Sequence, residues 1–292
     1  MMRSTRPSFE EERKALPFLI PALLVLCLIS LYPLIQGISR MFYTYQALTQ
    51  KTVFVGLQNV KLLFSDHLFL RAFTNSLVWT GVSVIMQFIL SYWLATMLNS
   101  RFLRLRRMFR GITIIPWALP PVVIALMWRY IFLGNGPLNM FLHSLGVAHP
   151  PNWLTEPRLA LWTCIIANIW MGIPFVTVML LAGLQTIDKN LLDAAAIDGA
   201  NYLQMQYRII IPSVKKVILI ILTLETIWTF NMFDIVFVLT KGGPGNASLT
   251  LPLYAYENAF MYYQPGYGAT IGMFILLCLL TVVVLYIREV LR

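Results

Sequence analysis

The stretch LALWTCIIANIWMGIPFVTVMLLAGL, residues 159–184, decides the fold. It contains no Asp, Glu, Lys or Arg over its whole length. An α-helix needs about 20 predominantly apolar residues to cross the hydrocarbon core of a bilayer, and this stretch is longer than that. It therefore predicts a membrane-spanning helix and makes polytopic membrane proteins the class to consider first.

Five further apolar stretches lie on either side of it. They cover residues 16–38, 76–98, 112–133, 217–239 and 269–287. The stretch over 112–133 contains Pro116, Pro120 and Pro121, which a membrane helix accommodates as a bend when neighbouring helices satisfy the freed carbonyls. The sequence thus predicts an all-α polytopic membrane protein with six transmembrane helices in a single domain, residues 1–292.

The composition agrees with a membrane protein and disfavours a soluble enzyme. Hydrophobic residues make up 59% and charged residues 12% of the chain, and the mean hydropathy is +0.73, whereas soluble domains carry about 25% charged residues. The net charge of +10 comes from Lys and Arg that are spread over the loops, so it does not indicate nucleic-acid binding. Cys27, Cys164 and Cys278 lie in apolar stretches, where free cysteine behaves as a small hydrophobe.

The distribution of basic residues predicts the orientation in the membrane. Of the 22 Lys and Arg residues, 15 lie before the first stretch, after the last one, or in the second and fourth connections; the other 7 are six residues in the remaining connections and Arg129, near the outer end of the third stretch. Because cytoplasmic loops carry the excess of Lys and Arg, both termini are expected in the cytoplasm. The first stretch is too long for a cleaved export signal and no cleavage site follows Ile38, so we expect it to be retained.

The fourth connection is more than a linker. Together with the last residue of the preceding stretch it reads LQTIDKNLLDAAAIDGANYLQMQYRIIIPSVKK, residues 184–216. We expect a helix over 191–197 with Asp188 or Asn190 as its N-cap, and Gly199 suits the left-handed residue at which such a helix stops. This coupling loop, about 185–216, is therefore expected to hold a short cytoplasmic helix.

A second helical piece is expected over 202–210, ending near Pro212. On the first piece, Leu192, Ala195, Ala196 and Gly199 recur at the spacing of one helical face. Small side chains on that face predict close approach by another protein.

The coupling loop resembles the permease subunits of binding-protein-dependent ABC importers. Their signature is E-A-A, then Gly, then I-x-x-P, and here the matching residues keep its spacing. The residues assigned to coupling by this resemblance are Asp193, Ala194, Ala195, Ala196, Ile197, Asp198, Gly199, Ala200, Ile209 and Pro212. Asp193 departs conservatively from the usual Glu. Gln206 and Lys216 stand where the carbohydrate-uptake branch tends to have an aromatic residue and a proline, so the docking contact there is expected to differ.

Two more stretches are similar to that carbohydrate-uptake branch, the maltose-permease-type family. Residues 239–260, LTKGGPGNASLTLPLYAYENAF, resemble its G-G-P-x-x-x-T-x-x-L-x-x-Y-x-Y-x-x-A-F pattern, and residues 54–79 resemble its F-x-G-L-x-N segment and the N-[ST] that follows. The resemblance therefore covers nearly the entire chain.

The resemblance implies a permease subunit in a prokaryotic cytoplasmic (inner) membrane that forms an alternating-access pathway for a sugar or glycoside-like solute. Its implied partners are a second related permease, a dimer of ATPase subunits, an exported solute-binding protein and the lipid bilayer. The sequence contains no G-x-x-x-x-G-K-[ST] phosphate loop, so we expect no enzyme activity and no cofactor on this chain, with ATP and Mg²⁺ bound by the ATPase subunits.

Polar residues inside apolar stretches are the candidate solute contacts. Asn231 and Asp234 are three residues apart, with Trp228 one turn earlier, an arrangement that offers hydrogen bonds and an aromatic surface to a sugar. The equally weighted alternative is that Asn231 and Asp234 bond to other helices. Glu225 is expected to point away from Asp234 and to pair with a partner subunit.

Gln87, and Asn168 with Trp170, are second candidates for solute contact, with helix–helix bonding as the preferred alternative. The histidines lack metal-site spacing, so no metal site and no catalytic residue set is predicted. A secondary transporter driven by an ion gradient is the alternative function, in which Glu225 or Asp234 would be the proton site. That alternative leaves the signature from Asp193 to Pro212 unexplained.

Overall fold

The computed structural model describes residues 9–46, 51–100 and 106–291. Arg3, Arg6, Arg101 and Arg104, which contribute to the predicted orientation, lie outside these ranges. The elements of the first half are α1 Phe9–Leu26, the π-helical η1 Cys27–Leu31, α2 Tyr32–Arg40, β1 Tyr43–Gln46, β2 Lys51–Phe54, α3 Gln58–Ser65, α4 His67–Asn99, α5 Arg106–Ala118, α6 Pro121–Ile131 and α7 Pro137–Ser144. Those of the second half are α8 Ala160–Gln185, α9 Lys189–Ile197, α10 Tyr202–Met205, the π-helical η2 Gln206–Ile210, α11 Ile211–Ser213, α12 Lys215–Phe230, α13 Asp234–Leu239, α14 Leu251–Tyr256, the π-helical η3 Glu257–Met261 and α15 Pro265–Leu291.

The predicted apolar stretches all appear as helices. Within the described residues, five helical segments are long and apolar enough to cross a membrane, and a sixth crossing results if the bent pair of α5 and α6 counts as one span. The five segments are Pro17–Arg40, His67–Asn99, Ala160–Gln185, Lys215–Leu239 and Pro265–Val290. The prediction of a polytopic helical membrane protein is therefore confirmed.

The third predicted span is broken rather than gently bent. Its halves, Met108–Ala118 and Pro121–Ile131, meet at an angle of 97°. Pro120 has an extended ψ of 140° and lies directly before Pro121, the first residue of α6. Two successive prolines remove two backbone donors and disfavour helical geometry in the residue before each, so the helix cannot continue through them.

The fifth predicted span also divides, between α12 and α13. Helix α12 ends at Phe230 with Asn231 as its C-cap, and α13 starts at Asp234. An acidic residue in the first turn of a helix is favourable because it complements the positive end of the helix dipole. The predicted span over 217–239 is confirmed by the segment Lys215–Leu239, and the short interruption between α12 and α13 is a detail that the sequence pattern did not indicate.

The second span begins earlier than predicted, at His67 instead of Ser76. Asp66 caps α4, because its side chain accepts a hydrogen bond from the backbone N–H of Leu68 at 2.8 Å. The first nine residues of α4 contain an arginine and a histidine, so their mean hydropathy is below that of a membrane span. The sequence prediction therefore started this helix too late. A short antiparallel hairpin, β1 with β2, is a further addition to the all-α prediction.

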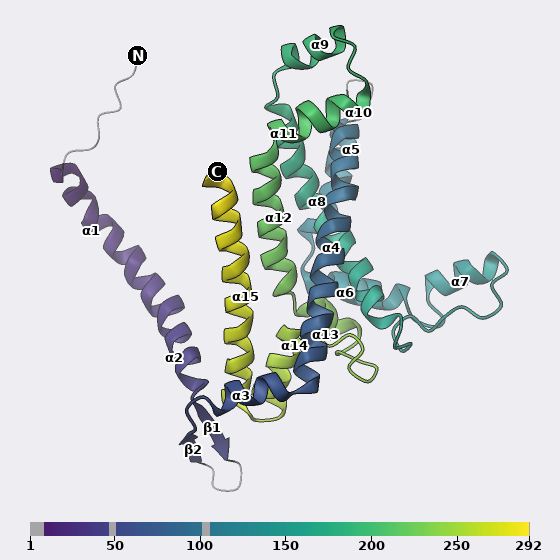
Figure 1. Cartoon of the computed structure of the whole chain (residues 1–292). Helices are drawn as coiled ribbons and strands as arrows, with labels where there is room; N and C mark the ends of the chain where they lie inside the picture. The colour runs from purple at the N-terminus through teal and green to yellow at the C-terminus, as the bar shows by residue number, and fades with distance from the viewer. Residues whose placement is uncertain (1–8, 47–50, 101–105, 292) are drawn as a thin grey trace.

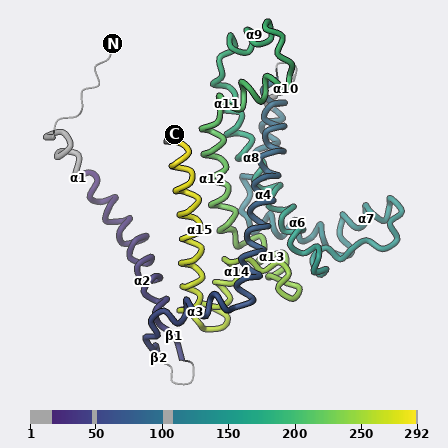
Figure 2. The backbone as a smooth tube through the Cα atoms, in the orientation of Figure 1, coloured from purple at the N-terminus to yellow at the C-terminus, as the bar shows by residue number. Residues whose placement is uncertain are grey.

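The bundle is built around α4 and α8, which pack along much of their length (Figure 1). Helices α12 and α15 run beside them, whereas the α1–η1–α2 rod stands apart from the bundle (Figure 2). No residue of the Pro17–Arg40 window is buried within the described chain. The start of α1 and the end of α15 point toward the same side as α9, and the hairpin with α3 lies at the opposite side (Figure 1). We call these the α9 side and the hairpin side.

Candidate functional site

The coupling loop folds into two capped helical pieces on the α9 side. Asp188 Oδ1 accepts a hydrogen bond from the N–H of Asn190 at 2.9 Å, which caps α9. Gly199 follows the helix with φ +78°, in the left-handed region that glycine adopts without strain. The predicted cap at Asp188 and stop at Gly199 are confirmed, and Asn190 is a residue of α9 and not its cap.

The second piece begins with a reciprocal cap. Asn201 Oδ1 accepts from the N–H of Gln204 at 2.8 Å, and Gln204 Oε1 accepts from the N–H of Asn201 at 2.9 Å. This capping box satisfies two backbone donors at the start of α10. Helical geometry then continues through η2 and α11 to Ser213, next to Pro212, so the predicted second piece is confirmed.

The exposed face of α9 differs from the predicted one. Ala195 is only 9% exposed, and Leu192 packs against a cluster of buried residues from α4, α8, η2 and α12. Two of the four residues expected to receive a partner are therefore turned toward their own chain. Ile197 is instead 87% exposed, and Asp193 and Ala194 lie in the open beside it. A helix on a surface must turn its less polar stripe inward, and spacing alone does not show which stripe that is.

Gln206 connects this loop to the membrane helices. Its Oε1 accepts a hydrogen bond from the phenol of Tyr92 in α4 at 2.5 Å, and the Gln206 side chain is buried. The Gln206 side chain faces its own bundle, and the expectation of a different docking contact at this position stays a prediction. Tyr92 was missed by sequence reasoning, since a tyrosine within an apolar stretch gives no distinguishing signal.

A second site lies within the bundle, a cavity of about 210 Å³ between α4, α6, α8 and α12 that we call the central cavity. Its polar lining comes from Gln87, Asn168, Glu225 and Thr229, among other residues. Gln87 Nε2 donates to the backbone carbonyl of Asn168 at 2.8 Å. Within the described part of the chain, Gln87 Oε1 and Asn168 Nδ2 are buried and find no hydrogen-bond partner. Buried polar atoms of this kind require a partner, which a bound solute or water can supply.

Aromatic rings from α5, α8 and α12 also line the central cavity. Trp117, Phe175 and Trp228 line it, and the rings of Phe175 and Trp228 meet edge to face with centroids 4.8 Å apart. Gly172 leaves the space that Gln87 occupies, since a Cβ at Gly172 would lie 2.2 Å from Gln87 Nε2. Aromatic faces combined with amide and carboxylate groups suit a polyhydroxylated solute.

The predicted solute contacts divide into two groups. Gln87, Asn168 and Trp228 line the central cavity, although they come from three different helices. Asn231 and Asp234 are not among its lining residues. Asn231 is the C-cap of α12 and Asp234 the first residue of α13, and their role as solute contacts stays a prediction.

Trp170 and Glu225 differ in their position relative to the central cavity. Trp170 packs edge to face on Trp128, with ring centroids 6.0 Å apart, and is not part of the cavity lining. Glu225 does line the cavity and is only 5% exposed. The expectation that Glu225 pairs with a partner subunit stays a prediction.

The two outer motifs meet each other on the hairpin side. Asn75 Nδ2 donates to the carbonyl oxygens of Asn246, Ala247 and Leu249, at 3.4, 3.2 and 2.9 Å. The neighbouring Ser76 Oγ accepts from the N–H of Leu251 at 2.8 Å. The motif between 54 and 79 therefore holds the loop of the motif between 239 and 260, which is a structural role for both.

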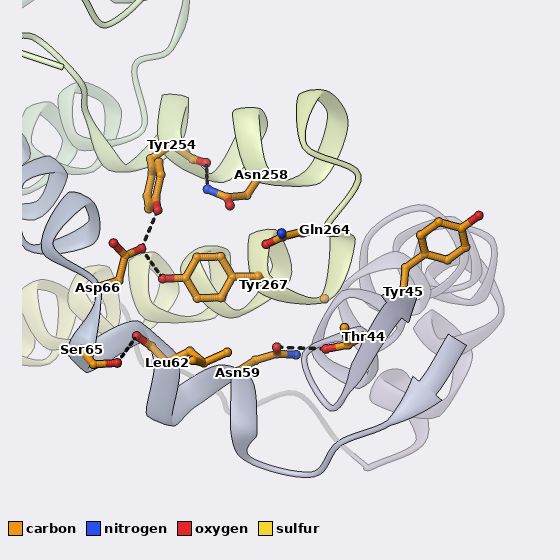
Figure 3. A pocket seen from close by; sticks show the side chains of 11 residues that line it. Thr44, Tyr45, Asn59, Leu62, Ser65, Asp66, Tyr254, Asn258, Gln264 and Tyr267 are labelled. Atoms are coloured by element: carbon orange, nitrogen blue, oxygen red, sulfur yellow. Dashed lines mark hydrogen bonds between the residues drawn. The ribbon is translucent and has the colours of Figure 1, made fainter. Parts of the chain in front are cut away.

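The same two motifs, together with β1 and the start of α15, line an outer pocket of about 500 Å³, shown in Figure 3. Tyr254 and Tyr267 both donate to Asp66 Oδ2 at 2.5 Å. Burial alone would raise the pKa of Asp66, but these bonds and those from the N–H groups of Leu68 and Phe69 lower it below its usual value of 3.8. Burial, followed by the contact with Asp66, raises the pKa of Tyr254, so the tyrosine remains a donor.

The comparisons with known proteins agree with this arrangement. Residues 87–292 match the family described as binding-protein-dependent transport system inner membrane component. The chain belongs to this permease family. It is 32% identical over 286 residues to the trehalose/maltose transport system permease protein of Thermococcus litoralis, covering 98% of this chain and 96% of that one. It is 33% identical over 275 residues to the arabinooligosaccharides transport system permease protein of Bacillus subtilis, covering 92% and 87%.

The fold also occurs in a solved transporter. A chain of a bacterial ABC transporter involved in the import of the acidic polysaccharide alginate superposes with a TM-score of 0.82, at 22% identity and 96% coverage of both chains. Family and fold together make this permease a membrane component of an ABC importer. The alternative of an ion-gradient-driven secondary transporter is thereby set aside.

Proposed function

We propose that this permease forms, as a single domain with a second related permease, the pathway by which a sugar or glycoside-like solute enters a prokaryotic cell across its cytoplasmic membrane. The central cavity supports this proposal most directly, because it combines three aromatic rings with two buried amide atoms, Gln87 Oε1 and Asn168 Nδ2, that have no partner among the described residues. The names of its relatives, which transport trehalose or maltose and arabinooligosaccharides, favour a carbohydrate.

The solute would contact Gln87, Asn168 and Trp228, together with Glu225. Glu225 brings a carboxyl group to a cavity that is otherwise lined by neutral residues, such as Thr229 and Met232. A carboxylate accepts hydrogen bonds from sugar hydroxyls more strongly than a neutral group does. Asn231, Asp234 and Trp170 remain proposed contacts only for a pathway that extends beyond this cavity.

The coupling loop would contact an ATPase subunit, and movement of that subunit would be transmitted through it to the membrane helices. In this proposal both termini and α9 face the cytoplasm, in agreement with the excess of Lys and Arg on that side. The exposed residues around Ile197 would enter the ATPase subunit, while Leu192 holds α9 to the bundle. A packed contact of this kind transmits movement because it shifts as a unit. ATP and Mg²⁺ would bind to the ATPase dimer, and an exported solute-binding protein would deliver the solute.

Uptake by the reconstituted complex tests the proposal. Proteoliposomes that contain this chain, its partner permease and the ATPase subunits should accumulate labelled carbohydrate only with ATP inside and the binding protein outside. Vanadate should abolish uptake and an ionophore should leave it unchanged. Gln87→Ala and Glu225→Gln should raise the solute concentration for half-maximal uptake by about tenfold, the effect of one lost hydrogen bond to a charged or buried group. Gln36→Ala, at an exposed glutamine of α2, is the matched control, and unchanged kinetics in both cavity variants would reject the central cavity as the solute site.

A further inference from the structure

A third cavity, of about 220 Å³, lies between the ends of α4, α5 and α8 that are nearest to the coupling loop. We call it the α4–α5–α8 cavity. Its apolar walls come from Leu98, Ile114, Val178, Leu181 and Ala182, and its polar lining from Arg110, Thr113, Thr177 and Gln185. None of these residues lines the central cavity, so the two sites are separate.

Two buried donors in this cavity lack a partner. Among the described residues, neither Arg110 Nε nor Thr177 Oγ1 has a hydrogen bond, although both atoms are buried. Thr177 as a whole is only 1% exposed, whereas the Thr113 hydroxyl is satisfied by the carbonyl of Phe109 at 2.8 Å. A guanidinium group stays charged in proteins and cannot neutralise itself. Leaving a buried N–H of such a group unpaired is costly, so an acceptor oxygen beside Arg110 Nε and Thr177 Oγ1 would be stabilising.

The chain does not supply a negative partner from the helices that form the cavity. No Asp or Glu occurs between His67 and Thr155, which includes α4 and α5, or within α8. The run from 101 to 110 contributes five arginines instead, at positions 101, 104, 106, 107 and 110. A basic cluster of this size next to the membrane attracts anionic lipid headgroups. The missing acceptor is therefore expected to be an anion from outside the chain.

The surroundings of the cavity favour a lipid over a dissolved ion. Ile114 and Val178 line the cavity and are also 39% and 44% exposed, so apolar side chains continue from its wall onto the outer surface of the bundle. A dissolved phosphate gains nothing from apolar walls, whereas the acyl chains of a phospholipid do. Arg110 and Thr177 would then hold the phosphate, as basic pockets between membrane helices do.

We propose that the α4–α5–α8 cavity binds the phosphate group of an anionic phospholipid, with Arg110 and Thr177 as its donors. Assignment of this lipid to the cytoplasmic leaflet rests on the orientation proposed above. The lipid would fill the space between the bent α5–α6 pair and the α4–α8 pair, next to the coupling loop. An anionic phospholipid is then a structural component of this permease.

Native mass spectrometry of the complete transporter complex tests this proposal. The probes are phosphatidylglycerol and phosphatidylcholine with identical acyl chains, titrated into the detergent-solubilised complex. The wild-type complex should prefer phosphatidylglycerol, and Arg110→Gln should weaken that binding by about tenfold, since a charge-assisted hydrogen bond is lost. Thr177→Val should weaken it in the same direction while keeping the shape of the side chain. Arg288→Gln removes an exposed arginine near the end of α15, and it should leave binding unchanged.

The outcomes separate the sources of the anion and keep the proposal falsifiable. If the Arg110→Gln and Thr177→Val complexes both keep the wild-type preference for phosphatidylglycerol over phosphatidylcholine, the proposal is overturned. Competition by millimolar inorganic phosphate would also overturn it, in favour of a dissolved ion. If Arg110→Gln does not assemble, Thr177→Val decides by the same criterion. Sugar uptake by the wild-type complex is measured separately in both lipids, so failure of the lipid site is distinguishable from failure of the proposed transport function.

Discussion

The phenol of Tyr92 donates a hydrogen bond to Oε1 of Gln206 at 2.5 Å, and this bond joins α4 to η2, the π-helical turn that follows α10 in the coupling loop. Both ends of the contact are shielded, because Gln206 is 8% exposed and Tyr92 is half-buried. Since α4 also contributes Gln87 to the central cavity, one helix links the coupling loop with the proposed solute site.

Tyr92→Phe should reduce coupling without preventing assembly. The substitution leaves Gln206 Oε1 buried and unpaired, which costs about 1–3 kcal/mol. We expect ATP hydrolysis by the complex to persist while the amount of solute imported per ATP falls. Tyr207→Phe, at an exposed tyrosine of the same helical piece, is the matched control. An unchanged transport ratio in Tyr92→Phe would show that this bond only supports the fold.

Backbone strain alone should decide which substitutions Gly199 tolerates. A Cβ at Gly199 meets no atom within 4 Å, but its φ of +78° disfavours every other residue. We expect the rate of uptake to be highest in Gly199→Asn, lower in Gly199→Ala and lowest in Gly199→Val. Residues that disfavour the left-handed region carry about 1–3 kcal/mol of backbone strain. Gly272→Ala, at an equally open glycine without positive φ, is the control. Wild-type uptake in Gly199→Val, with the complex inserted normally, contradicts coupling through this loop.

Gly172→Ala should disturb the central cavity. The added methyl group would overlap Gln87 Nε2, so Gln87 must leave its bond to the carbonyl of Asn168. Overpacking of this kind costs about 1–3 kcal/mol. We expect the solute concentration for half-maximal uptake to rise while binding of the ATPase subunits is retained. Gly81→Ala in α4, where no atom lies within 4 Å of the new Cβ, should have no effect, and equal uptake in the two variants would count against the placement of Gln87.

Asp66 should make the stability of the hairpin side depend on acid pH. The pKa of Asp66 is lowered in the folded chain, mainly because hydrogen bonds from Tyr254 and Tyr267 outweigh the effect of burial. Its stabilising contribution is therefore complete above the unfolded pKa of about 3.9 and is lost as the pH falls through the folded pKa. We expect the thermal midpoint of the complex to decrease below about pH 4 for this reason. Asp66→Asn should lower the midpoint at pH 7 and remove this acid-dependent part.

The control for that measurement is Asp198→Asn, at an exposed carboxylate on the α9 side. It should leave the midpoint and its acid dependence as in the wild type. A midpoint for Asp66→Asn that follows the wild-type curve at every pH would show that the two tyrosine contacts do not stabilise the chain.

Local features of the coupling loop could be predicted from the sequence because short-range chemistry determines them. Asp188 caps the helix that follows it, and Gly199 takes the left-handed conformation, as their positions indicated. The break at Asn231 and the orientation of Ala195 could not be predicted in this way. Both depend on which neighbouring helices are present, and helical periodicity describes a face without stating what covers it.

The sequence by itself determined the membrane class, the positions of the spans and the family, because hydropathy and motif spacing are properties of contiguous residues. Only the tertiary structure decided which polar residues share a cavity. Gln87, Asn168 and Glu225 come from three helices, and their meeting depends on how α4, α8 and α12 pack. The same packing leaves Arg110 Nε and Thr177 Oγ1 without an acceptor among the described residues in another cavity. Contacts between distant segments follow from the close packing of whole helices, which no local stretch of sequence specifies.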